Sequence, residues 1–164
     1  MPTITYDPIL DTAAPPRSPV RPWPGTALVL VTVTGLPLVV LYGERVRVAE
    51  YRHAHLVDVA GHELRMAARL PTRDPGLAFA ATIGFSCQVT NPVMVATSGI
   101  RDTAAALRPR LVKILRQTAR HYEKADAAVA ELALNCALDR YYGNSAMRLG
   151  EFTVTLDGVE RAPR

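Results

Sequence analysis

The clearest hydrophobic pattern in the chain is a strict alternation between residues 77 and 90. Apolar residues occupy the odd positions from Leu77 to Val89, and small or polar residues occupy most of the even positions. A period of two places these sets on opposite faces of a β-strand. Asn91-Pro92 ends the run, because proline cannot donate to a strand ladder and holds the preceding residue extended. We therefore predict one long strand with a buried face.

Shorter apolar runs before residue 77 predict further strands. Residues 26–42 are rich in β-branched side chains, which pack well on a pleated surface, and predict two strands joined near Gly35-Leu36-Pro37. Proline, glycine and aspartate make Thr72–Gly76 an exposed loop. The remaining predicted strands are Glu44–Ala49, Leu56–Val59 and Leu64–Leu70.

Helical spacing follows the long strand. Pro92 suits the first position of a short helix that leaves through Ser98-Gly99, and Asp102 is a good N-cap for the next helix. Pro109 lies inside that second helix, where it would cost about 3 kcal/mol. We expect a kink or a restart there, with Arg108 at the junction. The predicted helices are Pro92–Thr97, Thr103–Tyr122 and Ala125–Tyr142, the last ending at Gly143-Asn144 in a left-handed cap.

These elements and a closing strand at Phe152–Leu156 predict an α+β fold with an antiparallel-rich sheet and two to three helices. Residues 26–157 form a single domain in this interpretation. Residues 1–25 are rich in proline and predict an extended arm outside the core. Residues 158–164 predict a polar tail.

Positive charge is concentrated on the second predicted helix. The chain has a net charge of +4, and basic residues occupy the helix face opposite Leu107, Leu111 and Leu115. Such a face is typical of a solvated surface or a protein interface, and it also fits anionic lipid. Nucleic acid is the alternative partner, which the low aromatic content disfavours. The residues concerned are Arg108, Arg110, Lys113, Arg116 and Arg120.

An uncharged segment leaves a membrane contact open. Residues 26–42 are near the minimum length that spans a bilayer, about 17 residues. Their β-branched residues, with Gly35 and Pro37, favour strands over a spanning helix. An aromatic residue between prolines suits the headgroup level of a membrane. The residues proposed for this contact are Trp23, Leu28, Leu30, Leu36, Leu38 and Leu41.

Catalytic and metal-binding patterns are weak. His53, His55 and His62 lie close together and suit zinc by residue type, but they match no known zinc spacing, so a solvated strand edge is favoured. The carboxylates of Glu50, Asp58 and Glu63 are not placed opposite one another by any pattern.

Nucleophile and phosphate motifs are also missing from the sequence. Ser86 and Ser98 do not lie in a Gly-x-Ser-x-Gly elbow, and no Gly-rich phosphate loop occurs. Cys87 and Cys136 lie in apolar segments without a metal or redox spacing. We expect both to be buried in a reducing compartment. We predict no enzyme activity, no metal and no cofactor.

The order of these motifs resembles a known family. The run from Phe79 to Pro92, followed by Gly99–Asp102, Leu107, Leu111–Arg116, Tyr142-Gly143 and Phe152–Asp157, is similar to the SPFH, or band 7, domain of stomatins, prohibitins and flotillins. In that family a strand ends in a turn like Val89–Pro92, and a helix carries a pair like Leu115-Arg116. Early glycines and valines, at Gly35, Val39-Val40 and Gly43, extend the resemblance over about residues 28–157.

The resemblance implies a scaffold or adaptor domain that binds proteins, including copies of itself. It implies no catalytic residue. It places the protein in the cytoplasm, with the inner face of the membrane as a further location. Family members usually carry a membrane segment before the domain and a long coiled coil after it. Here the first is marginal and the second is absent after Asp157, which limits the assembly expected of this chain.

Overall fold

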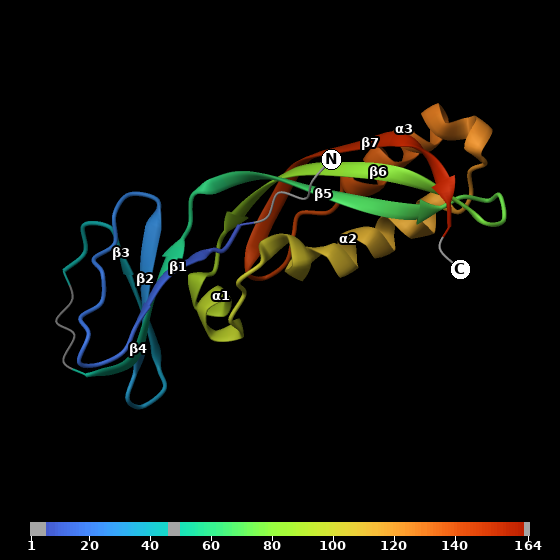
Figure 1. The fold of residues 1–164 in the computed structure, drawn as a ribbon. Coiled ribbons are helices and arrows are strands. Elements are labelled where there is room, and N and C mark those ends of the chain that lie inside the picture. Colours follow the sequence, from blue (N-terminus) through green and yellow to red (C-terminus); the bar gives the residue numbers. More distant parts are fainter. Residues whose placement is uncertain (1–5, 46–49, 163–164) are drawn as a thin grey trace.

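The computed structural model describes residues 6–45 and 50–162, and it contains two antiparallel sheets (Figure 1). The four-stranded sheet has the order β1-β4-β2-β3, and the three-stranded sheet has the order β5-β6-β7. The strands of the first sheet are β1 Ile9–Ala13, β2 Thr26–Thr32, β3 Pro37–Leu41 and β4 Tyr51–Asp58. Those of the second are β5 Gly61–Pro71, β6 Leu77–Val89 and β7 Met147–Arg161.

Helices lie between β6 and β7 in the sequence. They are α1 Pro92–Ser98, α2 Thr103–Ala119 and α3 Ala127–Leu138, with a short 3-10 turn, η1 Lys124–Asp126, before α3. In Figure 1, α2 runs along the three-stranded sheet and α1 lies near the junction of the two sheets. The predicted α+β class, with antiparallel sheets and three helices, is confirmed.

The two sheets are joined by a direct passage of the chain from β4 into β5. The backbone bends at Val59-Ala60, and β5 then pairs with β6 over its whole length, from Gly61 opposite Gln88 to Pro71 opposite Ala78. The two predicted strands in this part of the chain are therefore confirmed but belong to different sheets. The N–H of Val59 donates to the carbonyl of Gly25 at 2.8 Å, which holds the bend against the arm.

The main core lies between the three-stranded sheet and its helices. The alternation in β6 directs Phe79, Ile83 and Phe85 towards Leu111 and its neighbours on α2, and all of these side chains are buried. Burying each large apolar side chain is worth about 1.5–3 kcal/mol. The predicted long strand and its buried face are confirmed.

Two helix ends that were predicted from the sequence are present, the exit of α1 at Gly99 and the N-cap of α2 at Asp102, and α1 also has an N-cap at Asn91. The side chain of Asn91 accepts from the N–H of Met94 at 3.1 Å, and Gly99 ends α1 in the left-handed region at φ 64°. The carboxylate of Asp102 accepts from the N–H of Ala105 at 2.9 Å at the start of α2. Both satisfy backbone groups that a helix end leaves unpaired.

The predicted restart at Pro109 is wrong, because α2 is continuous through this residue. Pro109 lies on the exposed face of the helix. The carbonyl that its missing N–H would have bonded belongs to Ala105, which is also exposed. Water can solvate that carbonyl, so the cost of the proline is reduced.

The third helix ends earlier than predicted, at Leu138 instead of Tyr142. Its C-cap is Asp139 in right-handed geometry, so Gly143 is not a helix cap. Gly143 instead has φ 108°, and a Cβ there would fall on the carbonyl oxygen of Met147. Glycine is required because the backbone at the start of β7 passes directly against it.

Both ends of the chain contribute more than was expected. Within the arm, Ile9 and Ala13 belong to β1 and are buried, although residues 1–25 were placed outside the core. At the other end, Gly158–Arg161 belong to β7, since the long strand β6 pairs as far as Leu77 opposite Arg161. The predicted polar tail at these positions is wrong.

The predicted strand Glu44–Ala49 lies partly outside the described residues. Of Glu44–Ala49, Glu44 and Arg45 lie outside any strand, and residues 46–49 lie outside the described residues. The remaining pair of predicted strands, within residues 26–42, forms the β2–β3 hairpin with Gly35 at φ 85° in its turn.

Candidate functional site: a basic groove and two apolar surfaces

All five basic residues predicted for a surface stripe are exposed on α2. The helix turns Leu107, Leu111 and Leu115 into the core, so the positions between them point outwards. The structure divides the basic residues into two groups, however. Four of them line an open groove between α2 and β5, and Arg110 does not.

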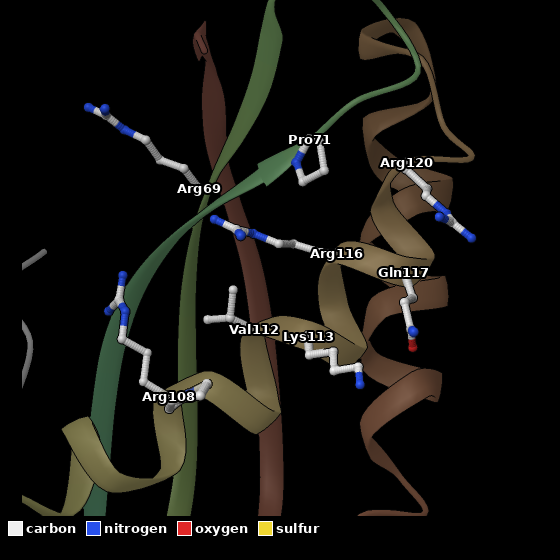
Figure 2. A pocket seen from close by; sticks show the side chains of 9 residues that line it. Arg69, Pro71, Arg108, Val112, Lys113, Arg116, Gln117 and Arg120 are labelled. Atoms are coloured by element: carbon white, nitrogen blue, oxygen red, sulfur yellow. The ribbon is translucent and has the colours of Figure 1, made fainter. Parts of the chain in front are cut away.

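The groove has a volume of about 610 Å³, and we call it the basic groove. Figure 2 shows Arg116 extending from α2 towards β5, whereas Lys113 and Arg120 point away from that strand. Its apolar lining consists of the half-buried Val112 and two exposed prolines. The lining residues are Arg69, Pro71, Arg108, Pro109, Val112, Lys113, Arg116, Gln117 and Arg120.

Arg110 faces the other side of α2. Burial raises the pKa of Tyr141, which follows α3, and the positive charge of Arg110 acts in the opposite direction. Arg110 is thus near enough to Tyr141 to affect its ionisation, and it does not line the groove. It therefore shares the helix and the charge of the groove residues but not their location.

Arg69 is a groove residue that sequence reasoning missed. It lies on β5, and its guanidinium forms an ion pair with Glu160 of β7 at 2.9 Å. The alternation of β5 predicts only that its side chain points away from Leu70. Its position opposite α2 depends on how the helix packs on the sheet, which no local pattern shows.

Arg108 has a structural role as well as a charge. Its guanidinium donates to the carbonyl oxygen of Ala67 at 2.8 Å. β5 is an edge strand of its sheet, so this carbonyl has no neighbouring strand to bond. Occupied edge groups resist pairing with another chain.

The other α2 cations are available to a ligand. Within residues 6–45 and 50–162, Lys113, Arg116 and Arg120 make no ion pair, since the five that the structure contains involve other residues. Exposed ion pairs contribute little to stability in any case. These three charges are therefore more useful for recognition than for the fold.

A second candidate surface is the outer face of α3. Val129 is 57% exposed and Leu132 is 69% exposed, and Cys136 lies one turn further along the same face. The opposite face, with Leu134, packs into the core. The prediction that Cys136 is buried is wrong. It fails because α3 is apolar on both faces, so its sequence does not show which face is inside.

The residues proposed for a membrane contact do not form one surface. Leu28 and Leu30 are buried in a small core on the four-stranded sheet, so they are not available. Leu38 and Leu41 are partly exposed but lie on opposite faces of β3, because side chains alternate along a strand.

Two other exposed members of that set, Leu36 and Trp23, are far apart. Leu36, 68% exposed, lies in the turn of the β2–β3 hairpin, and Trp23 precedes the far end of β2. Seven strand residues, about 23 Å, separate these ends. In the part of the chain that the structure describes, no helix is long and apolar enough to cross a membrane.

The histidines are not gathered into one site. The Nε2 of His62 donates to the carboxylate of Asp58 at 2.8 Å, and the ring stacks on Tyr6, with ring centroids 4.3 Å apart. His53 and His55 neighbour each other on β4 instead, at a centroid distance of 6.4 Å. Among the described residues, no group of three His, Cys, Asp or Glu side chains has the arrangement of a metal site.

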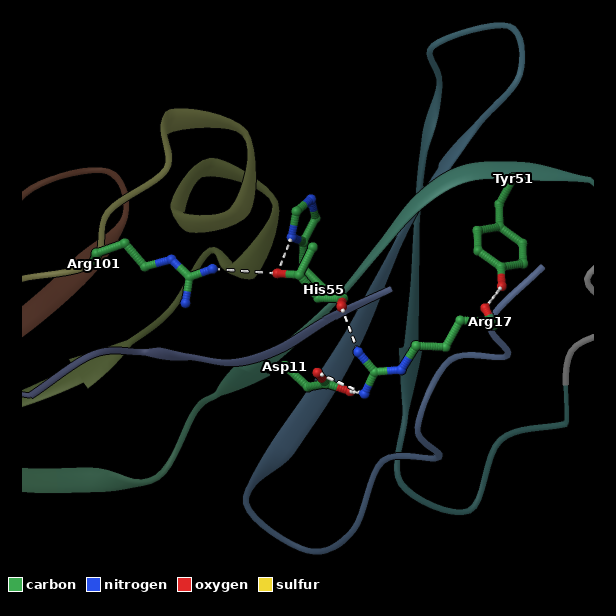
Figure 3. Close-up of polar contacts among 6 residues, drawn as sticks. Asp11, Arg17, Tyr51, His55 and Arg101 are labelled. Carbon is green, nitrogen blue, oxygen red and sulfur yellow. Dashed lines mark hydrogen bonds and ion pairs between the residues drawn. The ribbon is translucent and has the colours of Figure 1, made fainter. Parts of the chain in front are cut away.

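His55 belongs to a polar network that holds β1 on β4 (Figure 3). Its Nδ1 lies 3.2 Å from the hydroxyl of Thr12, and Arg101 reaches the same hydroxyl at 3.4 Å. Burial lowers the pKa of His55, and the charges of His53 and Arg101 lower it further. This arrangement favours a neutral, structural histidine.

The remaining nucleophile candidate is inert in this fold. Cys87 is 1% exposed, and burial raises the pKa of its thiol to about 11. A thiol must ionise to act as a nucleophile. Cys87 is therefore a core residue, as was predicted from its apolar surroundings.

Comparison with known proteins adds no assignment. No protein-family model matches the chain, and no curated protein matches its sequence. The function must therefore be argued from the surfaces described above.

Proposed function

We propose that this protein is a non-enzymatic scaffold or adaptor domain of the SPFH, or band 7, type, which associates with copies of itself. The order of the elements supports this proposal: the strand β6, the Asn91-Pro92 turn, three helices and the closing strand β7 follow one another as in that family's pattern. Leu115-Arg116 has the expected division of roles, with Leu115 in the core and Arg116 exposed.

The observation that carries the proposal is the outer face of α3. Val129, Leu132 and Cys136 present an uncharged apolar strip to solvent. Helices with apolar residues on both faces are normally covered on both. Two copies of this chain, each with a net charge of +4, repel one another in general, and a face without charge is where they can approach.

The association is expected to be weak and symmetric. A helix of 12 residues is about 18 Å long, so one face of α3 buries less than the roughly 800 Å² per partner of a standard interface. Packing the same strip of two copies against itself gives a two-fold dimer. Reversible contacts of this size assemble a scaffold only where the protein is locally concentrated.

Sedimentation velocity over a range of protein concentrations tests this proposal. Wild-type protein should show a mass that rises with concentration at moderate salt, and Leu132→Asp should remove the rise because it buries a carboxylate in each copy. Leu36→Asp is the matched control, since Leu36 is equally exposed but lies in the β2–β3 turn. Monomeric wild-type protein, or equal loss in both variants, would contradict the proposed interface.

A membrane is the place we propose for such local concentration, on the cytoplasmic side. The exposed turn of the β2–β3 hairpin, with Leu36 and the 43% exposed Val33, is the apolar contact that we propose for it. Co-sedimentation with liposomes should be weakened by Leu36→Asp and unaffected by Leu132→Asp. The reverse result, or no binding of wild-type protein, would remove the membrane from the proposal.

A further inference from the structure

The lining of the basic groove is positively charged, which favours an anionic ligand. None of its lining residues is acidic, and Arg69, Lys113, Arg116 and Arg120 present positive charge from β5 and from α2. Of these four, only Arg69 forms an ion pair among the described residues, with Glu160 of β7. An anion in the groove therefore meets unpaired positive charge mainly from α2 and its C-cap.

The length of the groove selects an extended ligand. Arg108 and Arg120 are twelve residues apart on α2, which corresponds to about 18 Å along the helix axis. A single phosphate or headgroup reaches one or two of these cations. An extended polypeptide advances about 3.3 Å per residue, so a segment of about six residues spans them all.

The shape and the lining of the groove exclude two other polyanions. A flat bilayer surface contacts the exposed cations of the groove but not the half-buried Val112, which an inserted segment can reach. Single-stranded nucleic acid is usually held by aromatic side chains on which bases stack. No aromatic side chain lines the groove.

From these observations we infer that the basic groove binds an extended, acidic segment of a partner protein. Arg116 and Lys113 pair with carboxylates of the segment, and guanidinium groups bind carboxylates in a fixed, two-pronged geometry. Pro71, Pro109 and Val112 contact the aliphatic parts of the segment. This site lies on α2 and β5, so it is independent of the α3 face proposed for self-association.

Fluorescence anisotropy with a labelled peptide tests the inference. The probe is a peptide of about eight residues composed of Glu, Asp and Ser, and its control replaces every Glu and Asp with Gln and Asn. The acidic peptide should bind and the amide peptide should not. Binding should weaken with added salt, because the charges are exposed. Equal binding of both peptides, or none, would overturn the inference.

Matched variants locate the site. Lys113→Glu with Arg116→Glu should lower the affinity at least about tenfold at low salt, since the change reverses two charges in the groove. Lys113→Glu with Arg110→Glu is the comparison, because it changes the net charge equally but reverses only one groove residue, and it should lower the affinity clearly less. Arg108 is left unchanged because it holds the β5 edge.

Two competitors decide the class of partner. An oligothymidylate and phosphatidylserine vesicles are each tested against wild-type protein and the double groove variant. Tighter binding of either competitor than of the acidic peptide, lost in the groove variant, would overturn the protein segment as the occupant. Sedimentation of the groove variant is expected to match the wild type, so failure here is distinguishable from failure of the α3 interface.

Discussion

The three-stranded and the four-stranded sheets bury their apolar residues against different partners. The three-stranded sheet packs under α2 and α3, and its core includes Phe79, Phe85 and Leu111. The outer part of the four-stranded sheet has only a small cluster around Leu30 and Val40. Helices supply large, regularly spaced side chains to a core, whereas the chain segment near β2 and β3 is rich in proline and supplies few.

The two sheets therefore differ in how well they support a binding surface. The helical part of the molecule carries the basic groove and the α3 face on a well-packed core, and preorganised surfaces of this kind bind with less loss of entropy. The thinly covered sheet has the most exposed of its described leucines, Leu36, at the tip of a hairpin instead. Similar residues of the two regions should therefore respond differently to substitution.

Gly143 and Gly35 both have positive φ, but their surroundings differ. Gly143→Ala places a methyl group on the carbonyl of Met147 and should cost more than about 4 kcal/mol or prevent folding. Gly35→Ala meets no atom within 4 Å and should cost only about 1 kcal/mol for the left-handed backbone. Urea unfolding of both variants measures this difference. Similar losses of stability in the two variants would show that the backbone of Met147 does not lie tightly against Gly143.

Leu111 and Leu30 are both buried, but in different cores. Leu111→Ala should lower the free energy of unfolding by about 3–5 kcal/mol, because the helices and the sheet cannot collapse into the cavity. Leu30→Ala should cost about 2–3 kcal/mol, since the small cluster is easier to rearrange. The measurement is again urea unfolding, monitored by circular dichroism. An equal or larger loss for Leu30→Ala would contradict the contrast between the cores.

In both sheets a side chain bonds to backbone groups of an edge strand. The bonded groups are partly buried in one sheet and exposed in the other. Asn135 of α3 donates to the carbonyl of Val154 at 2.9 Å and accepts from its N–H at 2.8 Å. Asn135→Ala leaves both groups partly buried and unpaired, for a loss of about 1–3 kcal/mol. Arg17→Ala removes an exposed bond to the carbonyl of Thr12 and an ion pair with Asp11 at 3.0 Å, and should cost less than about 1 kcal/mol. Equal midpoints in thermal unfolding would refute this ranking.

The smallest expected effect is the pH dependence from His55. Its pKa is lowered in the folded protein, so the unfolded chain binds a proton first as the pH falls below about 6.5. Stability contributed by this residue is therefore present at neutral pH and is lost on acidification. His55→Gln should unfold with a flatter pH profile between pH 7.5 and 5 than the wild type. Identical profiles would show that the Thr12 network does not exclude the charged form.

Local features of the sequence predicted much of the fold. The alternation in β6, the end of α1 at Gly99 and the N-cap at Asp102 depend only on neighbouring residues, and all three are present. Strand β1 was missed because the prolines around it dominate the composition of the arm. Its pairing with β4 is a contact distant in sequence, which no local pattern contains.

The candidate sites were only partly predictable for the same reason. The helical period identified the exposed cations of α2, but the position of Arg69 and the separation of Arg110 depend on packing between α2 and its neighbours. The sequence does not show which face of α3 is exposed. Leu132 and Leu134 are the same residue type in the same apolar segment, but Leu132 is exposed and Leu134 is buried.

Cross-linking at Cys136 tests the proposed scaffold interface most directly. Cys136 is exposed on the α3 face and Cys87 is buried, so a short bis-maleimide should join copies of the wild-type protein through Cys136 alone. The account predicts a covalent dimer that increases with protein concentration and is absent in Leu132→Asp. A concentration-dependent mass without this cross-link, or an equal yield in Leu132→Asp, would show that the copies do not meet at α3.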